Sequence, residues 1–459
     1  MELVQIVDSL KDKKILFLGQ SRTMSKEDIE LFLEQIGAKR AEDETDEPIA
    51  LIVLGRLINP YEEAYSDEKK RAGVFVVTLE DVEKYYAYYI DPDALLGSLR
   101  LFANRERIIN LLRNRAISDD LFCDILKLYD WEDKTPFETD ENRDVAGMIV
   151  ARFYPNIERN HNIQYSPIGP FLVASQCENI KLLEAMSLIS DYEITQRSQD
   201  IWMPRTLHEA ILINSNLPTP LLEKFWQTNS LRKQGFVAMH PNLPKSRQDD
   251  LINSKECWIL EGLARNPNLS QNLYDKFLNS TNRVIKNAFL QNQPLNWDII
   301  KSVIKEGDEK SLEAIGLNPH LNEEVAIGLI NLGNETLISF LASNSSLSKN
   351  AYEAIELTKN VSILRRLAAN PSAPSELLER LTRIRDKDIY VALAANPTTP
   401  KTLLRNFSKI KDEDIRISLA SNPSTPIEIL LNYQTDANLA NILKRNEAFT
   451  DYIKQNIGW

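Results

Sequence analysis

Apolar side chains recur three and four residues apart inside many short segments of this chain, which is the spacing of helices that bury one face. From about residue 205 onward this pattern repeats every 26 residues, without insertion or deletion. We call the most regular point of the repeat the marker position, and eight of its nine residues are asparagine. An apolar residue stands three before each marker and another eleven after it, and a small residue usually stands two before it. So constant a period indicates a repeat protein. The marker residues are Asn214, His240, Asn266, Asn292, Asn318, Asn344, Asn370, Asn396 and Asn422.

Each 26-residue unit is expected to hold two short helices. The first ends at the marker, because asparagine tolerates the left-handed conformation that closes many helices and the proline that often follows cannot continue the helix. The second begins with a proline in its first turn or with a residue suited to cap a helix. Such prolines are Pro244, Pro374, Pro400 and Pro426, and such caps are Ser270, Asn296, Asn322 and Ser348. Asp386 and Asp412 recur at the repeat period and are expected at helix N-termini.

The repeated marker has two interpretations, a ladder of ligands or a side chain that satisfies backbone groups at a recurrent turn. We favour the second, since buried backbone groups need partners and asparagine is a turn residue. One helix pair cannot bury its apolar stripe alone, so the units must stack. Residues 205–459 are therefore predicted to form a regular all-α solenoid with a C-terminal cap that includes Trp459. Residues 91–204 are predicted to be a helical linker with degenerate repeats, in which Asn114 and Ser175 take the marker position.

The segments LAANPSAPSELLERL, LAANPTTPKTLLRNF and LASNPSTPIEILLNY resemble units of the leucine-rich repeat variant family, a HEAT-like helical array. The resemblance covers about residues 205–445 and implies an all-helical solenoid. The period of 26 is somewhat longer than is typical of the family. The cysteine cluster that accompanies one such protein is missing, so no iron–sulfur centre is implied.

Residues 1–90 have a different pattern. Buried strands are expected at 13–20, 49–56 and 74–78, a short strand at 39–43, and helices at 25–38, 65–73 and 79–89. This order predicts a small α/β sandwich around a parallel sheet.

Several residues of this segment resemble a BRCT domain: Leu18-Gly19 at a strand end, the turn Ile36-Gly37-Ala38, and Gly73 before VFVVTLEDV. BRCT domains bind partner proteins, often through a phosphoserine held by a hydroxyl at the strand end and a lysine on the second helix. Leu18 stands at the hydroxyl position here, which departs from the family. The resemblance leaves Ser21, Lys69 and Lys70 as candidate phosphate ligands, with binding or packing without phosphate as the alternative.

Charge is distributed unevenly. The chain carries −12, and residues 1–104 alone hold 13 Lys/Arg and 21 Asp/Glu, or −8, which disfavours DNA binding by this part. Residues 365–416 are locally rich in Lys and Arg with Asp and Glu interleaved. A solenoid surface laced with salt bridges explains this composition. The alternative is a basic stripe for nucleic acid or an acidic partner, with Arg365, Arg366 and Arg416 in first helices as its residues.

No catalytic, cofactor or metal-binding residues are predicted. Cys123, Cys177 and Cys257 form no CxxC pair, and the four histidines form no metal or catalytic motif. The chain shows no secretory signal or membrane span, which predicts a cytoplasmic protein. The leading hypothesis is a non-enzymatic scaffold that binds a protein partner. The rival is a DNA-associated factor that uses the basic stripe, and a glycosylase-like enzyme is supported by analogy alone.

Overall fold

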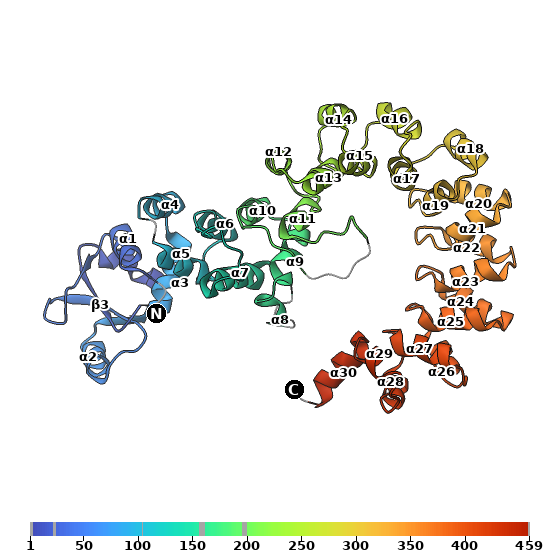
Figure 1. Cartoon of the computed structure of the whole chain (residues 1–459). Coiled ribbons are helices and arrows are strands. Elements are labelled where there is room, and N and C mark those ends of the chain that lie inside the picture. The colour runs from blue at the N-terminus through green and yellow to red at the C-terminus, as the bar shows by residue number, and fades with distance from the viewer. Residues whose placement is uncertain (1–2, 22–23, 103, 156–160, 195–199, 458–459) are drawn as a thin grey trace. The chain divides into compact units, whose positions relative to one another are not determined.

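The computed structural model describes residues 3–21, 24–102, 104–155, 161–194 and 200–457. By their internal contacts the residues form two compact units, 1–236 and 237–459. Most of the chain is helical, with one small parallel sheet near the N-terminus, as predicted (Figure 1). Among the described residues, no helix is long and apolar enough to cross a membrane. The predicted domain boundaries at residues 90 and 204 stay predictions, and Trp459 lies outside the described residues.

The sheet has four parallel strands in the order β2-β1-β3-β4. Their bounds are Lys14–Leu18 (β1), Lys39–Arg40 (β2), Ile49–Leu54 (β3) and Phe75–Thr78 (β4). Helix α1 (Lys26–Ile36) connects β1 to β2, α2 (Pro60–Arg71) connects β3 to β4, and α3 (Leu79–Tyr89) follows β4. Two short 3₁₀ helices, Leu3–Gln5 and Val7–Leu10, precede the sheet. The centre of β3 is fully buried, as expected for a strand with helices on both faces.

Local sequence sets the ends of these helices. Ser25, Asn59 and Thr78 each begin a helix with a capping box, in which the side chain accepts from a backbone N–H of the first turn and an acidic residue three positions on accepts in return. The box at Asn59 starts α2 several residues before the predicted start at residue 65. Gly37 ends α1 in the left-handed region, at a φ of 66°, where the sequence predicted a turn.

A buried ion pair joins the sheet domain to the helices that follow. Asp28 of α1 and Arg107 of α5 (Arg105–Arg113) are 0% and 1% exposed. The Arg107 Nε and Nη2 atoms donate to Asp28 Oδ1 at 3.0 and 2.7 Å, and the Tyr86 hydroxyl donates to the same oxygen at 3.1 Å. Arg107 Nη1 donates to Ser98 of α4 (Pro92–Leu101), and Ser25 Oγ donates to Asp28 Oδ2. Every part of the pair is therefore hydrogen-bonded, which is what a buried charge requires.

The rest of the chain is helical. The first unit continues with α6 (Asp119–Leu126), α7 (Asp140–Phe153), α8 (His161–Gln164), α9 (Ile168–Gln176), α10 (Ile180–Met186), α11 (Leu207–Leu212), α12 (Thr219–Trp226) and α13 (Leu231–Met239), within which the second unit begins. The second unit holds α14 (Lys245–Leu251), α15 (Cys257–Ala264), α16 (Tyr274–Leu278), α17 (Arg283–Asn292), α18 (Trp297–Glu306), α19 (Glu309–Gly316), α20 (Glu323–Asn331), α21 (Glu335–Leu341), α22 (Lys349–Glu356), α23 (Val361–Ala369), α24 (Ser375–Leu381), α25 (Lys387–Ala395), α26 (Lys401–Phe407), α27 (Glu413–Ser421), α28 (Ile427–Tyr433), α29 (Ala440–Leu443) and α30 (Glu447–Ile457).

In the second unit the odd-numbered helices from α15 to α29 pack one against the next, and the even-numbered helices lie beside them in a second row (Figure 1). The small residues predicted in the first helix of each pair let its neighbour approach closely. At Gly316 an added Cβ would lie 2.5 Å from the Cβ of Phe340 in the next odd-numbered helix, so no larger residue fits there without a shift. The N-caps predicted at Asn296, Asn322, Ser348 and the two aspartates are present, whereas Ser270 makes no capping bond and the prolines stand at the N-cap itself.

Most of the marker asparagines form a continuous set of hydrogen bonds, which we call the amide ladder. Asn370 is typical: its Nδ2 donates to the carbonyls of Ala342 and Asn344, both at 2.9 Å, and its Oδ1 accepts from the Ser372 N–H. Equivalent bonds link successive repeats from Asn266 to Asn446, with Gln293 in place of the marker Asn292 and Asn446 only 24 residues after Asn422. The marker thus satisfies carbonyls left open at the end of the preceding first helix, as predicted.

Two details of the predicted register are wrong. Asn370, Asn396 and Asn422 have φ values of −73, −74 and −78°, so the backbone there is extended and not left-handed. Left-handed residues lie instead in the other turn, after the second helices α18, α20, α22 and α24, at Gly307, Gly333, Lys359 and Arg385. In the unit around residue 292, Gln293 makes the ladder bonds, since its extra methylene group and its place one residue later bring its amide to the same carbonyls.

Candidate functional site

The candidate phosphate ligands of the sheet domain do not come together. Ser21 follows the carboxyl end of β1, where its hydroxyl bonds only to the backbone of Met24. Lys69 forms an ion pair with Glu47, which precedes β3. Because the strands are parallel, the carboxyl end of β1 and the amino end of β3 lie at opposite ends of the strands. Ser21 and Lys69 are therefore on opposite sides of the domain. Lys70 is exposed on α2 and has no ion pair among the described residues. At the end of β1, the Gly19 N–H donates to the carboxylate of Glu62 at 3.2 Å.

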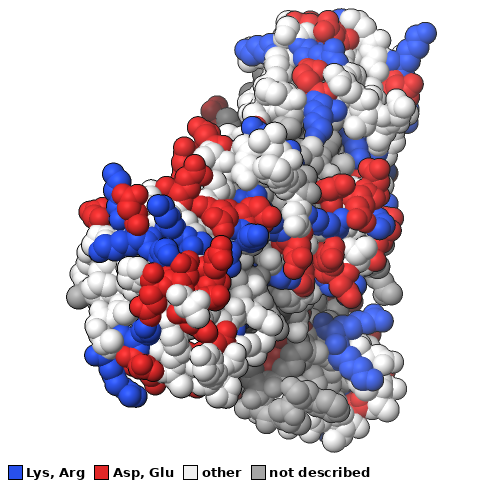
Figure 2. Space-filling view, turned by 90° about the vertical axis from the view of Figure 1, so that its left-hand side faces the viewer, with Lys and Arg blue, Asp and Glu red and all other residues white. Residues whose placement is uncertain are grey.

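Most residues of the predicted basic stripe form ion pairs with nearby carboxylates. Arg365 contacts Asp388 at 3.1 Å and Arg416 contacts Asp436 at 2.5 Å. The Arg366 guanidinium lies over the Phe340 ring, 5.5 Å from its centroid. Neighbouring basic residues are paired as well: Lys387 with Asp412 and Asp414, Arg380 with Glu356, and Arg405 with Glu428. Most of these pairs join adjacent units, which is the salt-bridged surface that the sequence favoured. Lys/Arg and Asp/Glu also intermingle on the face of the molecule in Figure 2.

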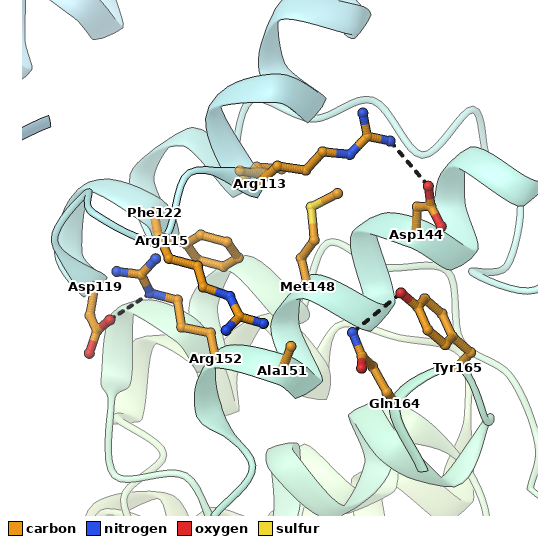
Figure 3. A pocket seen from close by; sticks show the side chains of 11 residues that line it. Arg113, Arg115, Asp119, Phe122, Asp144, Met148, Ala151, Arg152, Gln164 and Tyr165 are labelled. Atoms are coloured by element: carbon orange, nitrogen blue, oxygen red, sulfur yellow. Dashed lines mark hydrogen bonds and ion pairs between the residues drawn. The ribbon is translucent and has the colours of Figure 1, made fainter. Parts of the chain in front are cut away.

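A hollow of about 430 Å³ in the first unit brings three arginines together. It lies among α5, α6, α7 and α8, and we call it the Arg115 hollow (Figure 3). Arg113 and Arg115 flank the degenerate marker Asn114, whose Oδ1 accepts from the Ala116 N–H and shapes the turn. Arg152 comes from the last turn of α7. The other lining residues are Leu112, Asp119, Phe122, Asp144, Met148, Ala151, Gln164 and Tyr165.

The three guanidinium groups differ in their partners. Arg152 Nε donates to Asp119 Oδ1 at 2.6 Å, and its guanidinium lies 5.0 Å from the centroid of the Phe122 ring. Arg113 Nη2 contacts Asp144 Oδ2 at 3.1 Å. Arg115 is exposed and makes no hydrogen bond or ion pair with any described residue, and in Figure 3 its guanidinium points into the hollow toward Ala151. Three positive charges therefore meet two negative charges.

One wall of the Arg115 hollow depends on a glycine. An added Cβ at Gly147 of α7 would lie 2.5 and 2.8 Å from two ring carbons of Tyr165, so only glycine lets the ring lie against this helix. The Tyr165 hydroxyl lies 3.4 Å from Gln164 Nε2, and its side chain is half exposed. The wall that Tyr165 forms is thus set by the backbone of α7.

A second hollow shares Arg113 and Arg115 and reaches the carboxyl ends of β3 and β4. It adds Arg56 and Lys84 together with Glu80 and Glu83. Lys84 pairs with Glu80 at 2.9 Å, and Arg56 has no ion pair with a described residue. Burial raises the pKa of Glu83.

Sequence reasoning missed the Arg115 hollow. The signal available was a pair of arginines flanking Asn114, together with the break in repeat register at residues 135–156. That break contains α7, which supplies Asp144, Gly147 and Arg152. Nothing in the spacing indicated that this helix would return to the turn at Asn114.

The partly buried His208 of α11 is held neutral by its hydrogen-bond partners. Its Nε2 lies 2.8 Å from the carbonyl of Ile189 and its Nδ1 lies 3.0 Å from Lys233 Nζ, which also pairs with Asp191. A carbonyl only accepts and an ammonium only donates, so Nε2 carries the proton and Nδ1 carries none. Burial chiefly lowers the pKa of His208, Lys233 lowers it further, and Asp191 opposes both.

We therefore predict an acid-sensitive contribution to stability. An unfolded histidine takes up a proton near pH ~6.5 while the folded His208 does not, so the unfolded state gains protons and stability falls as the pH drops below this value. The His208→Gln variant lacks this titration. Urea midpoints of both proteins between pH 7.5 and 5.5 should show a steeper fall for wild type, by up to about 1.4 kcal/mol per pH unit. Parallel curves would exclude this role for His208.

Among the described residues, no group of three His, Cys, Asp or Glu side chains could hold a metal ion. Burial raises the pKa of the Cys123 thiol to about 12. No family model matches the chain, and no curated protein and no solved structure matches it significantly.

Proposed function

We propose that this protein is a non-enzymatic interaction scaffold whose helical array binds a protein partner. The observation that carries the proposal is the amide ladder, which fixes each 26-residue repeat to the repeat before it from residue 238 to residue 446. Such an array presents equivalent positions of successive 26-residue repeats side by side, as repeat proteins do at extended binding surfaces. A cytoplasmic location, expected from the sequence, is part of this proposal.

We also propose the finer assignments of both parts. The second unit is interpreted as an all-α solenoid of 26-residue two-helix repeats related to the leucine-rich repeat variant family, an interpretation supported by the alternation of its helices and by ladder bonds that span 26 residues. The sheet domain is interpreted as BRCT-like, which its strand order supports. The separation of Ser21 from Lys69 favours partner binding without phosphate at that domain.

Exposed apolar residues in one kind of turn support protein recognition. Leu332, Leu357 and Ile384 are 55%, 75% and 38% exposed. Each lies one or two residues before the left-handed residue that follows a second helix, at Gly333, Lys359 and Arg385. Three consecutive repeats thus expose a large apolar side chain at the same turn, and these side chains are the contacts that we propose for a protein partner.

The scaffold function predicts a capture experiment. Wild-type protein should retain a protein from an extract of the native host, and the triple variant Leu332→Ser, Leu357→Ser, Ile384→Ser should lose most of it, as quantified by mass spectrometry. Leu101→Ser is the control, since Leu101 is 79% exposed, more than any of the three, but belongs to the first unit. Equal retention by wild type and the triple variant would reject this edge as the binding surface.

A DNA-associated function through the predicted stripe has less support. Arg365 and Arg416 are each engaged by an aspartate, and Lys387, which lies between them in the sequence, is paired with two more. A phosphate backbone placed along this surface would meet those carboxylates as often as the arginines.

A further inference from the structure

The Arg115 hollow carries an excess of hydrogen-bond donors. A guanidinium has five N–H groups, and none from Arg115 reaches a described residue. Arg152 uses its Nε on Asp119 and its Nη2 on the Ile117 carbonyl, which leaves Nη1 without a protein acceptor among the described residues. The side chain of Arg115 points into the hollow, where it can meet a bound molecule (Figure 3).

The charges of the hollow favour an anion with several acceptor oxygens. A ligand with a carboxylate group would engage only one of the guanidinium groups, through its two oxygens, as carboxylates commonly do. A phosphate monoester has three terminal oxygens and a charge of about −1.5 to −2, so it can contact Arg115 and Arg152 together and offset the excess positive charge. Planar guanidinium groups suit this geometry better than ammonium groups do.

The arrangement of acidic residues favours a single phosphate over a nucleic-acid backbone. Asp119 and Asp144 lie on two sides of the hollow, and Glu80 and Glu83 line the adjoining hollow. A polynucleotide that followed Arg113 and Arg115 from one hollow to the other would bring further phosphates against these carboxylates. One isolated phosphate can sit by Arg115 without such contacts.

The size and walls of the hollow indicate that the ligand has an organic part as well. A volume of about 430 Å³ is within the range of small-molecule sites and exceeds what a phosphate group fills. Tyr165 and Met148 supply aromatic and apolar surface beside the arginines, whereas the Phe122 ring is buried beneath Arg152. The close contact between Tyr165 and Gly147 holds the ring at this wall.

We propose that the Arg115 hollow binds a phosphate monoester, with Arg115 and Arg152 on the phosphate and Tyr165 beside the organic part. Two sources have this chemistry, a phosphorylated serine or threonine of a peptide and a mononucleotide. The site stands independently of the proposed scaffold function, because it rests on helices of the first unit and not on the amide ladder of the second.

The test uses the full-length chain and isothermal titration calorimetry at low ionic strength. The probes are inorganic phosphate, a phosphoserine peptide with its unphosphorylated parent, and adenosine monophosphate with adenosine. Saturable binding of phosphate and of at least one monoester is expected, with no binding of the matching unphosphorylated probe. The monoester that binds more tightly identifies the source.

Variants assign the binding to the hollow. Arg115→Gln should weaken each phosphate-bearing probe about tenfold or more, because hydrogen bonds to charged groups are lost. Arg56→Gln is the matched control: Arg56 is also exposed and without an ion pair, but it lines only the adjoining hollow, so affinity should not change. Gly147→Ala displaces Tyr165 and should weaken the monoester more than inorganic phosphate.

Three results would overturn the proposal. The first is the absence of saturable binding by every probe. The second is an unchanged affinity in Arg115→Gln, or an equal loss in Arg56→Gln, which would indicate general charge attraction. The third is equal binding of the phosphorylated and unphosphorylated forms of a probe.

Discussion

The Arg107→Met variant should lose about 3–5 kcal/mol of stability in the N-terminal part of the chain. Methionine fills much of the space of arginine but leaves the Asp28 carboxylate buried without its counter-charge. The Tyr86 hydroxyl and Ser25 still donate to Asp28, and these neutral donors offset only part of the cost of a buried ion. Hydrogen exchange of full-length protein, followed by mass spectrometry, should show faster exchange in α1, α3 and α5.

A double variant separates the charge from the packing. Asp28→Asn with Arg107→Met leaves no buried charge, and the one amide oxygen of the asparagine still accepts from Tyr86, while its amide nitrogen takes the place of the oxygen that accepts from Ser25. Replacing both members of a buried pair is often close to neutral, so the double variant should be more stable than Arg107→Met alone. If the two single losses simply add, the pair is not coupled and the junction between the sheet domain and α5 depends on shape alone.

The Asn370→Asp variant should destabilise the second unit by about 3 kcal/mol or more at pH 7. The replacement has the same shape, and its oxygen can still accept from Ser372. However, it removes the two donors to Ala342 and Asn344 and directs a carboxylate at their carbonyls, at a site that is 3% exposed. The Ala342 carbonyl is left without this donor, at a cost of about 1–3 kcal/mol, and the Asn344 carbonyl keeps only the Tyr352 hydroxyl. The buried carboxylate that now faces both carbonyls adds its own desolvation cost.

The same variant should recover as the pH falls. Burial among carbonyls raises the pKa of the new carboxyl in the folded state, so the folded state binds the extra proton and the loss shrinks between pH 7 and 5. A protonated carboxyl can again donate to one carbonyl. Urea midpoints relative to wild type at each pH measure this, with Asn406→Asp at an exposed position of α26 as control. A loss that does not depend on pH would mean that Asn370 acts through its shape and not through its donors.

Much of the helical region could be predicted because its information is local and repeated. The marker period, the aspartate caps and the small residues of the first helices each follow from neighbouring residues. The conformation at the marker could not be predicted in this way. Asparagine is common both in left-handed turns and in side-chain bonds to backbone, and only the neighbouring unit decides which of these occurs at Asn370.

The candidate sites depended on contacts that lie far apart in sequence. Ser21 and Lys69 each have a side chain that can bind phosphate, but the lengths of β1 and α2 place them at opposite ends of the strands. Arg115 and Arg152 meet because α7 packs beside α5, within a segment that had no recognisable register. Charge composition alone therefore pointed to residues 365–416, where carboxylates pair with Arg365 and Arg416 and the Arg366 guanidinium lies over an aromatic ring.

The amide ladder also restricts how the length of this protein can change. In the regular part of the ladder, from Asn344 to Asn422, each rung joins a side chain to carbonyls 28 and 26 residues earlier, and Asn422 uses Ala394 and Asn396 in this way. If residues 371–396 were removed, Asn422 would meet the carbonyls of Ala368 and Asn370, which Asn396 uses in the full chain. Removal of half a 26-residue repeat would leave a marker side chain with no carbonyl within hydrogen-bond distance. The array can therefore grow or shrink only by whole 26-residue repeats. Its surface can vary in length only through the number of these repeats.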